Sequence, residues 1–139
     1  MSINKDFINK IIEEIKASIK IILEYSRDPF ESLDDARKYS IRYHLIVIAE
    51  ALSTLSIYLS RRLLKRIPET PLHAVHILME NKLVRGDEYR DIINIIKLRN
   101  LLVHRYWIIN DEIIYNNIRR DFKNILAFIN RVGNYVSKN

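Results

Sequence analysis

The chain has 139 residues, enough for one domain with a full hydrophobic core, and we expect a single domain over residues 1–139. It contains no cysteine, which excludes disulfide frameworks, thiolate metal ligands and cysteine nucleophiles and favours a cytoplasmic location. Lysine and arginine number 23 against 17 aspartates and glutamates, so the net charge of +6 favours an acidic or polyanionic partner.

The apolar residues are spaced for amphipathic helices rather than for hairpins or membrane spans. Only 2 glycines and 3 prolines are present, which leaves little material for tight turns and favours long helices. No apolar run approaches the roughly 20 residues that cross a bilayer. The N-terminal stretch MSINKDFINK also carries charges where a signal peptide is apolar. We therefore expect a soluble protein with no membrane segment.

Two long helices are predicted in the N-terminal half. Over residues Ile3–Tyr25 the apolar residues recur at i, i+3, i+4 and i+7, the spacing of one helix face. Pro29 separates this helix from the next, for which Ser32 in the stretch SLDD offers an N-cap. The second helix is expected to end near Lys65, before Pro68.

Three further helices are predicted in the C-terminal half. A short one covers Leu72–Glu80, and Gly86 then supplies a turn with Asp87 as the N-cap of the next helix. That helix runs from Glu88 through the stretch RNLLVHRYW, and the last helix restarts with Asp111 as its cap. Its expected buried face is Ile113, Ile114, Ile118, Phe122, Ile125, Leu126, Ile129 and Val132. The fold class is therefore all-α: an up-and-down antiparallel helical bundle of four long helices plus one short helix.

The stretch RNLLVHRYW, residues 99–107, places polar groups inside an otherwise apolar segment. If the helix continues through Tyr106, about 100° per residue puts Arg99 and Tyr106 on one stripe. Asn100 and His104 then share a second stripe as an i, i+4 pair able to hydrogen-bond. One helix cannot bring all four groups to a single atom. A second copy related by a two-fold axis would complete the set, and a kink near Val103 is the other solution.

RNLLVHRY resembles the R-x4-6-H motif of the HEPN superfamily and the R-x4-H-x-Y signature of HepT toxins, with Arg99, His104 and Tyr106 on the defining positions. Chain length, helix order and the restart at INDEIIYNNI are similar too, so the resemblance covers essentially the whole chain. It implies a HEPN-type bundle that dimerises through its motif helices and acts as a metal-independent ribonuclease toxin on RNA. It also implies an MNT-type nucleotidyltransferase antitoxin, MntA, which silences such toxins by transferring AMP from ATP to the motif tyrosine.

The residue types suit metal-free RNA cleavage, which needs a base for the 2'-OH proton, an acid for the leaving 5'-oxygen and positive charge at the phosphorane. Histidine changes charge near neutral pH, so two copies of His104 supply both proton transfers. Arg99 is suited to a bidentate hold on phosphate, and Asn100 orients His104 or donates to the phosphate. AMP on Tyr106 would place bulk and negative charge where a substrate phosphate binds. No metal and no cofactor are expected.

Two charged residues are candidates for supporting roles. Arg105, beside the motif histidine, is an expected RNA contact. Glu50 lies among apolar residues, and we expect it either to pair with Arg99 or Arg42 and support the site, or to be an exposed helix glutamate.

Other polar clusters have structural explanations. The four cations of SRRLLKRIPE complement the end of a helix dipole, with an RNA-binding extension as the alternative. They are Arg61, Arg62, Lys65 and Arg66. His73, His76 and Glu80 have helical spacing, but a metal site is disfavoured because it needs three or four converging ligands. His44 is interpreted as a helix-surface or interface residue.

Two rival functions stay open. In the first, the same groove is a non-catalytic nucleotide-binding or docking module for the nucleotidyltransferase partner, in which case Arg99 and His104 matter for complex formation without RNA turnover. In the second, the chain is a plain dimeric scaffold that uses Tyr106 and Trp107 as interface aromatics. The expected assembly is a homodimer, with a hetero-oligomer formed on binding the antitoxin.

Overall fold

The computed structural model describes residues 3–138, apart from the side chains of residues 119–121. All of its regular elements in that range are helical. They are α1 (Lys5–Tyr25), the 3-10 turn η1 (Phe30–Ser32), α2 (Asp35–Arg62), α3 (Pro71–Glu80), α4 (Gly86–His104), the 3-10 turn η2 (Tyr106–Ile108) and α5 (Asp111–Lys138).

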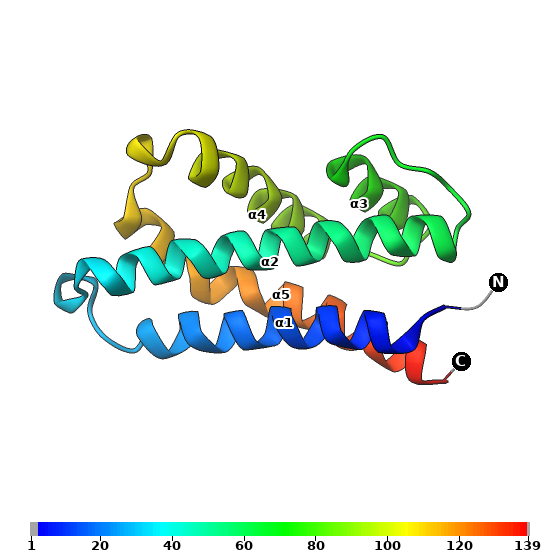
Figure 1. The fold of residues 1–139 in the computed structure, drawn as a ribbon, viewed down its shortest axis with the longest axis horizontal. Helices are drawn as coiled ribbons and strands as arrows, with labels where there is room; N and C mark the ends of the chain where they lie inside the picture. Colours follow the sequence, from blue (N-terminus) through cyan, green and yellow to red (C-terminus); the bar gives the residue numbers. More distant parts are fainter. Residues whose placement is uncertain (1–2, 139) are drawn as a thin grey trace.

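The four long helices form a closed ring in which every neighbouring pair is antiparallel. α1 packs on α2, α2 on α4, α4 on α5 and α5 on α1, while the short α3 packs on α2 and α4 (Figure 1). α1 begins and α5 ends at one end of the bundle, and α4, η2 and the start of α5 meet at the other (Figure 1). The predicted up-and-down bundle of four long helices plus one short helix is confirmed.

The predicted cap of the second helix was wrong by two residues. The Asp34 carboxylate accepts a hydrogen bond from the Arg37 N–H at 2.8 Å, and α2 starts directly after Asp34. Ser32 instead closes η1, where its hydroxyl donates to the Pro29 carbonyl at 2.7 Å. Ser32 belongs to η1 and lies three residues before the first residue of α2, whereas Asp34 directly precedes the helix and its carboxylate accepts the N–H of Arg37.

The predicted start of the fourth helix was also wrong. Gly86 is already the first residue of α4 and has no positive φ, whereas Lys82 supplies the left-handed residue of the turn with φ 63°. Asp87 is inside the helix, and the Glu88 carboxylate reaches back to accept the Arg85 N–H at 3.1 Å. This backward hydrogen bond satisfies the N-cap amide and lets the helix begin earlier than the sequence indicated.

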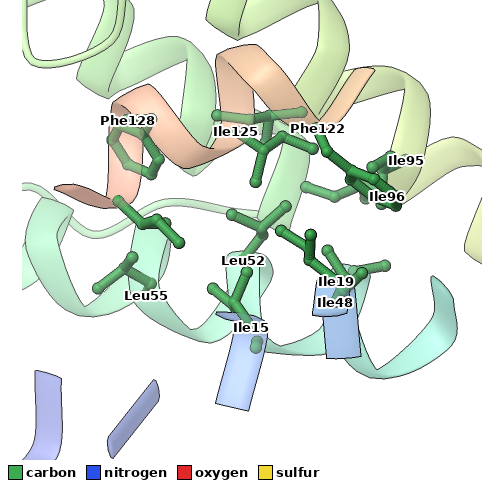
Figure 2. Close-up of a cluster of buried hydrophobic side chains, with 14 of the residues drawn as sticks. Ile15, Ile19, Ile48, Leu52, Leu55, Ile95, Ile96, Phe122, Ile125 and Phe128 are labelled. Carbon is green, nitrogen blue, oxygen red and sulfur yellow. The ribbon is translucent and has the colours of Figure 1, made fainter. Parts of the chain in front are cut away.

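The core forms where the inner faces of the four long helices meet (Figure 2). Its fully buried members include Ile15, Ile22, Ile48, Leu52, Leu55, Ile92, Phe122, Ile125 and Phe128. The predicted buried face of α5 is confirmed in part. Five of its residues are buried, Ile114 and Leu126 are partly buried, and the fully buried Phe128 was not predicted. Ile113, in the first turn of α5, is 59% exposed and lines an open groove beside α4.

A buried ion pair joins α4 to α5 at the end of the bundle where α4 begins. The Glu88 side chain is 1% exposed and accepts from Arg131, whose Nη1 lies 2.9 Å from it and whose Nη2 also donates to the Leu83 carbonyl at 3.1 Å. The hydrogen bond to Glu88 raises the pKa of Arg131. Asn124 donates to the buried Asp91 at 2.5 Å. Each buried carboxylate on α4 therefore has a donor on α5, which limits its desolvation cost.

His44 lies in the seam between α2 and α1. Its Nδ1 is 3.0 Å from the hydroxyl of Ser18 on α1, and its ring meets Tyr43 edge-on at 5.1 Å between centroids. Burial lowers the pKa of His44, because the positive form is desolvated there. His44 is therefore a half-buried residue at the contact between α2 and α1 within one chain.

By length and composition, α2 is the one described helix able to cross a membrane, so the expectation that no segment approaches that length was wrong. Half of its most apolar window is buried inside the protein. Between Arg42 and Arg61 its only acidic or basic side chain, histidine aside, is Glu50. The packing of α2 against three other helices accounts for this apolar character.

Replacing Ile125 by alanine tests the core. Ile125 is fully buried, so Ile125→Ala is expected to lower the free energy of unfolding by about 2–5 kcal/mol, measured by urea denaturation. Ile67→Ala is the matched control: Ile67 is 76% exposed, and its loss is expected to cost no more than about 0.5 kcal/mol. Equal costs at the two positions would contradict the placement of the core.

Acid destabilisation tests the seam at His44. Because the folded-state pKa of His44 is lowered, the unfolded chain takes up the proton first, and the free energy of unfolding falls as pH drops below about 6.5. Stability is full above that pH and is lost as pH falls through the folded-state pKa. Urea denaturation from pH 7.5 down to pH 5 measures the slope. His44→Gln should flatten it, and an unchanged slope would remove His44 as its source.

Candidate functional site

α4 ends at His104, so a helix continuous through Tyr106, the condition for the two shared stripes, is not formed. The Arg105 N–H makes the last helical hydrogen bond, to the Leu101 carbonyl at 2.8 Å, and Arg105 itself leaves the helix with φ −140° and ψ 45°. Tyr106 then begins the 3-10 turn η2. Arg99 and Tyr106 therefore share no helical stripe. The change of direction directly after His104 agrees with the alternative solution, a kink near Val103.

Arg99 is held by two neighbours. Its Nε forms an ion pair with the Glu50 carboxylate of α2, without the alignment of a hydrogen bond. Its Nη1 donates to the Asn100 Oδ1 at 3.2 Å. Glu50 therefore pairs with Arg99 and not with Arg42. Asn100 is engaged by Arg99, so the expected i, i+4 bond from Asn100 to His104 is absent among the described contacts.

The rest of the motif faces solvent. His104 and Arg105 are exposed, and neither side chain has a hydrogen bond or ion pair with any residue that the structure describes. Tyr106 is 60% exposed and meets the ring of Trp107 edge-on, with centroids 5.4 Å apart. An imidazole, a guanidinium and a phenol are thus all accessible within three consecutive residues.

Arg42 is the site residue whose role sequence reasoning missed. Its Nε and Nη2 donate to the two carboxylate oxygens of Asp111 at 2.7 and 3.1 Å, and its Nη1 donates to the Tyr106 carbonyl at 3.0 Å. This one guanidinium ties α2 to η2 and to the first residue of α5. The only signal in the sequence was an acidic residue at a helix start, which does not identify a partner so far along the chain.

An uncovered apolar surface surrounds the motif. Five large apolar side chains are exposed there: Leu101, Val103, Trp107, Ile108 and Ile113. Beside them an apolar groove of about 330 Å³ runs between α4 and α5, lined among others by Leu45, Leu98, Leu101, Ile113, Ile114 and Phe122. Contiguous exposed apolar surface of this kind marks interaction sites in soluble proteins.

The alternative metal ligands do not converge. The His73 Nδ1 accepts the Glu69 N–H at 3.0 Å, and His76 lies 3.6 Å from Glu80 as a two-residue pair. Within residues 3–138, and leaving aside the three side chains that are not described, no group of three His, Asp or Glu is placed to hold a metal ion.

The cations of SRRLLKRIPE lie away from the motif. Arg61 and Arg62 are in the last turn of α2, and Lys65 and Arg66 follow it, at the opposite end of the bundle from the end of α4 (Figure 1). The Arg62 guanidinium lies 5.8 Å from the centre of the Tyr58 ring, a cation–π distance. This placement fits the helix-dipole interpretation, and it separates these cations from the exposed motif residues.

Comparison with known families gives one match to this chain. The model of the family described as "Ribonuclease HepT-like" matches residues 9–132. No curated protein sequence matches the chain significantly.

Several solved structures with the same fold come from toxin–antitoxin pairs. One is a tri-AMPylated Shewanella oneidensis HEPN toxin in complex with an MNT antitoxin, with a TM-score of 0.84, 24% identity, and coverage of 94% of this chain and 98% of that one. A toxin–antitoxin structure with AMP-PNP gives a TM-score of 0.83 at 23% identity, covering 91% of this chain and 97% of that one. A mutant of an MntA–HpeT toxin–antitoxin pair gives 0.81 at 23% identity, with the same coverage. At these identities the similarity shows the fold.

Proposed function

Because the chain belongs to the HepT-like ribonuclease family, we propose that it is the toxin of a toxin–antitoxin pair and a metal-independent endoribonuclease. We further propose that it cleaves RNA at a composite site between two copies and is silenced by AMP transfer to Tyr106. One observation carries the proposal: His104, Arg105 and Tyr106 are exposed together at one end of the bundle, beside apolar surface that nothing in the described chain covers.

A second copy supplies what one protomer lacks. Each chain offers a single histidine at this end, because His44 is engaged with Ser18 in the seam between α1 and α2. Simultaneous acid and base chemistry on one phosphodiester needs two proton-transfer groups. A two-fold axis beside α4 would bring a second His104 to the site and cover exposed Leu101 and Val103.

The proposed cleavage is an internal transfer. One His104 takes the proton from the ribose 2'-OH while the 2'-oxygen bonds to phosphorus, and the partner copy's equivalent imidazolium protonates the 5'-oxygen as its bond to phosphorus breaks. The products are a 2',3'-cyclic phosphate and a 5'-hydroxyl. Arg99 stabilises the phosphorane charge. Glu50 and Asn100 act as positioning residues, because both contact the Arg99 guanidinium and neither contacts His104.

RNA binding is proposed to rest on charge beside the cleavage site. Arg105 is exposed and directly follows the proposed catalytic histidine, so it is suited to contact the phosphate next to the scissile one. The net charge of +6 adds attraction for a polyanion that does not depend on its sequence.

Tyr106 is the proposed acceptor of AMP. Its phenol is exposed to an approaching nucleotidyltransferase, so the phenolate oxygen can bond to the α-phosphorus of ATP as the bond to pyrophosphate breaks. The modified side chain carries a negative phosphodiester and a nucleoside within two residues of His104. The added group then competes with substrate phosphate for Arg99 and Arg105 and blocks access to the site.

RNA cleavage in EDTA tests the catalytic role of His104. The wild-type protein should produce 2',3'-cyclic phosphate ends, and His104→Ala should reduce the rate by about 10²–10⁴ because a proton-transfer group is lost. His76→Ala is the matched control, since His76 is an exposed histidine on α3 that contacts Glu80 and the ring of Tyr89. A His104→Ala protein that cleaves like wild type would remove His104 from the mechanism. Wild-type protein that binds the nucleotidyltransferase without cutting RNA would favour the docking module.

Mass spectrometry after incubation with the cognate nucleotidyltransferase and ATP tests the modification. We expect wild-type chain to gain one or more AMP units and to stop cutting RNA, and Tyr106→Phe to gain none because it lacks the acceptor oxygen. Tyr39→Phe, which removes an equally exposed phenol from α2, should be modified like wild type. AMP found on Tyr106→Phe would place the acceptor elsewhere.

A further inference from the structure

We propose that Arg42 is a positioning residue that holds the connector, defined as residues 105–110, in the conformation in which Tyr106 accepts AMP. The proposal rests on the proposed function of Tyr106. It concerns a residue on a different helix, whose side chain binds the peptide carbonyl of Tyr106 rather than its phenol. Arg42 therefore acts on the acceptor through the backbone that carries it.

The connector has few other restraints. Its own backbone bonds are those of a single 3-10 turn, the Ile108 N–H to the Arg105 carbonyl at 3.1 Å and the Ile109 N–H to the Tyr106 carbonyl at 3.4 Å. The side chains of residues 106–108 are all more than half exposed, whereas Ile109 is partly buried against the core and Asn110 accepts the N–H groups of Glu112 and Ile113. Of the described side chains outside the connector, Arg42 is the one that donates a hydrogen bond to it. The position of Tyr106 therefore depends strongly on this contact.

The geometry of the guanidinium explains why arginine is needed. Two N–H groups on one edge take both oxygens of the Asp111 carboxylate, at 2.7 and 3.1 Å, and this fixes the plane of the guanidinium. The third nitrogen, Nη1, is then aimed at the Tyr106 carbonyl. Both partners of the ion pair are mostly shielded, with the Arg42 side chain 16% and the Asp111 side chain 26% exposed. A lysine ammonium can keep the charge pair but cannot reproduce this fork.

The Arg42 guanidinium, with its bonds to Asp111 and to the Tyr106 carbonyl, also connects three elements at the end of the bundle where α4 ends and α5 begins. Arg42 is on α2, Tyr106 is in η2, and Asp111 is the first residue of α5. One side chain of α2 therefore contacts both the turn that follows α4 and the start of α5. A displacement of about 1 Å in a reacting group can lower the rate of a transfer reaction by a factor of about 10². Weakening the hydrogen bond from Arg42 to the Tyr106 carbonyl should therefore reduce the rate of AMP transfer.

The test uses full-length variants with the cognate nucleotidyltransferase and ATP. Arg42→Lys keeps the charge but loses the fork, and Arg42→Gln keeps a donor but loses the charge. Asp111→Asn weakens the ion pair while leaving Arg42 able to donate to the Tyr106 carbonyl. Arg37→Lys is the matched control, because Arg37 pairs with Asp28 at an exposed site on the same helix.

Two readouts separate positioning from stability. The first is kcat for AMP transfer to Tyr106, expected to fall about tenfold in both Arg42 variants and less than threefold in Asp111→Asn, with little change for Arg37→Lys. The second is the fluorescence anisotropy of Trp107, the only tryptophan of the chain and a connector residue. Anisotropy should fall in the Arg42 variants at temperatures where circular dichroism shows the bundle folded.

Wild-type kcat in either folded Arg42 variant would overturn the proposal. The Trp107 measurement needs no modification reaction. If wild-type protein is never modified on Tyr106, the proposed function fails, while lowered anisotropy in the Arg42 variants still shows that Arg42 orders the connector. Unchanged anisotropy in a folded Arg42 variant overturns the positioning role in every case.

Discussion

The site depends on the antiparallel register between α2 and α4. Two charged residues of α2, Arg42 and Glu50, reach across to the tyrosine segment and to Arg99 respectively. They are separated by about 12 Å along α2, at 1.5 Å per residue, and their partners Tyr106 and Arg99 run back along the opposite direction. Packing of the apolar faces fixes this register, because sliding one helix by a turn would expose core residues. The functional contacts are therefore consequences of core packing rather than independent features.

The ion pairs at the two ends of the bundle differ in burial and therefore in how much they stabilise the fold. At the end where α4 begins, Glu88 is almost completely buried and is fully paired with Arg131, so removing either partner would leave a desolvated charge. At the end where α4 stops, the pair of Arg99 and Glu50 is partly exposed, and such pairs contribute only about 0–1 kcal/mol to stability. The second pair contributes mainly orientation, since it restrains a guanidinium that donates to Asn100 through Nη1 and whose Nη2 has no hydrogen-bond partner among the described residues.

The sequence predicted the helices well because amphipathic spacing is a local property that packing reinforces. The same spacing identified Arg99, Asn100, His104 and Tyr106 as a group before their positions were known. It failed where a distant residue decides the local structure. The end of α4 at His104 accompanies the capture of the Tyr106 carbonyl by Arg42, and no pattern in RNLLVHRYW reports that contact. The predicted starts of α2 and α4 were wrong for a local reason. Several polar side chains near each helix start can accept the free backbone N–H groups, and the sequence does not show that Asp34 and Glu88 are the ones that do.

The break between α4 and η2 also limits how two copies can pair in the proposed dimer. For AMP to reach Tyr106 in an assembled dimer, the connector that carries it must stay outside the contact, whereas both copies of His104 must face the shared groove. His104 is the last residue of α4 and Tyr106 is past the change of direction, so these side chains are on different elements. Had α4 continued as a straight helix, Tyr106 would share a stripe with Arg99 and face the same groove. The break after His104 places the proposed dimer surface and the proposed acceptor of AMP on different elements, and the role proposed for Arg42 is to hold that break in place.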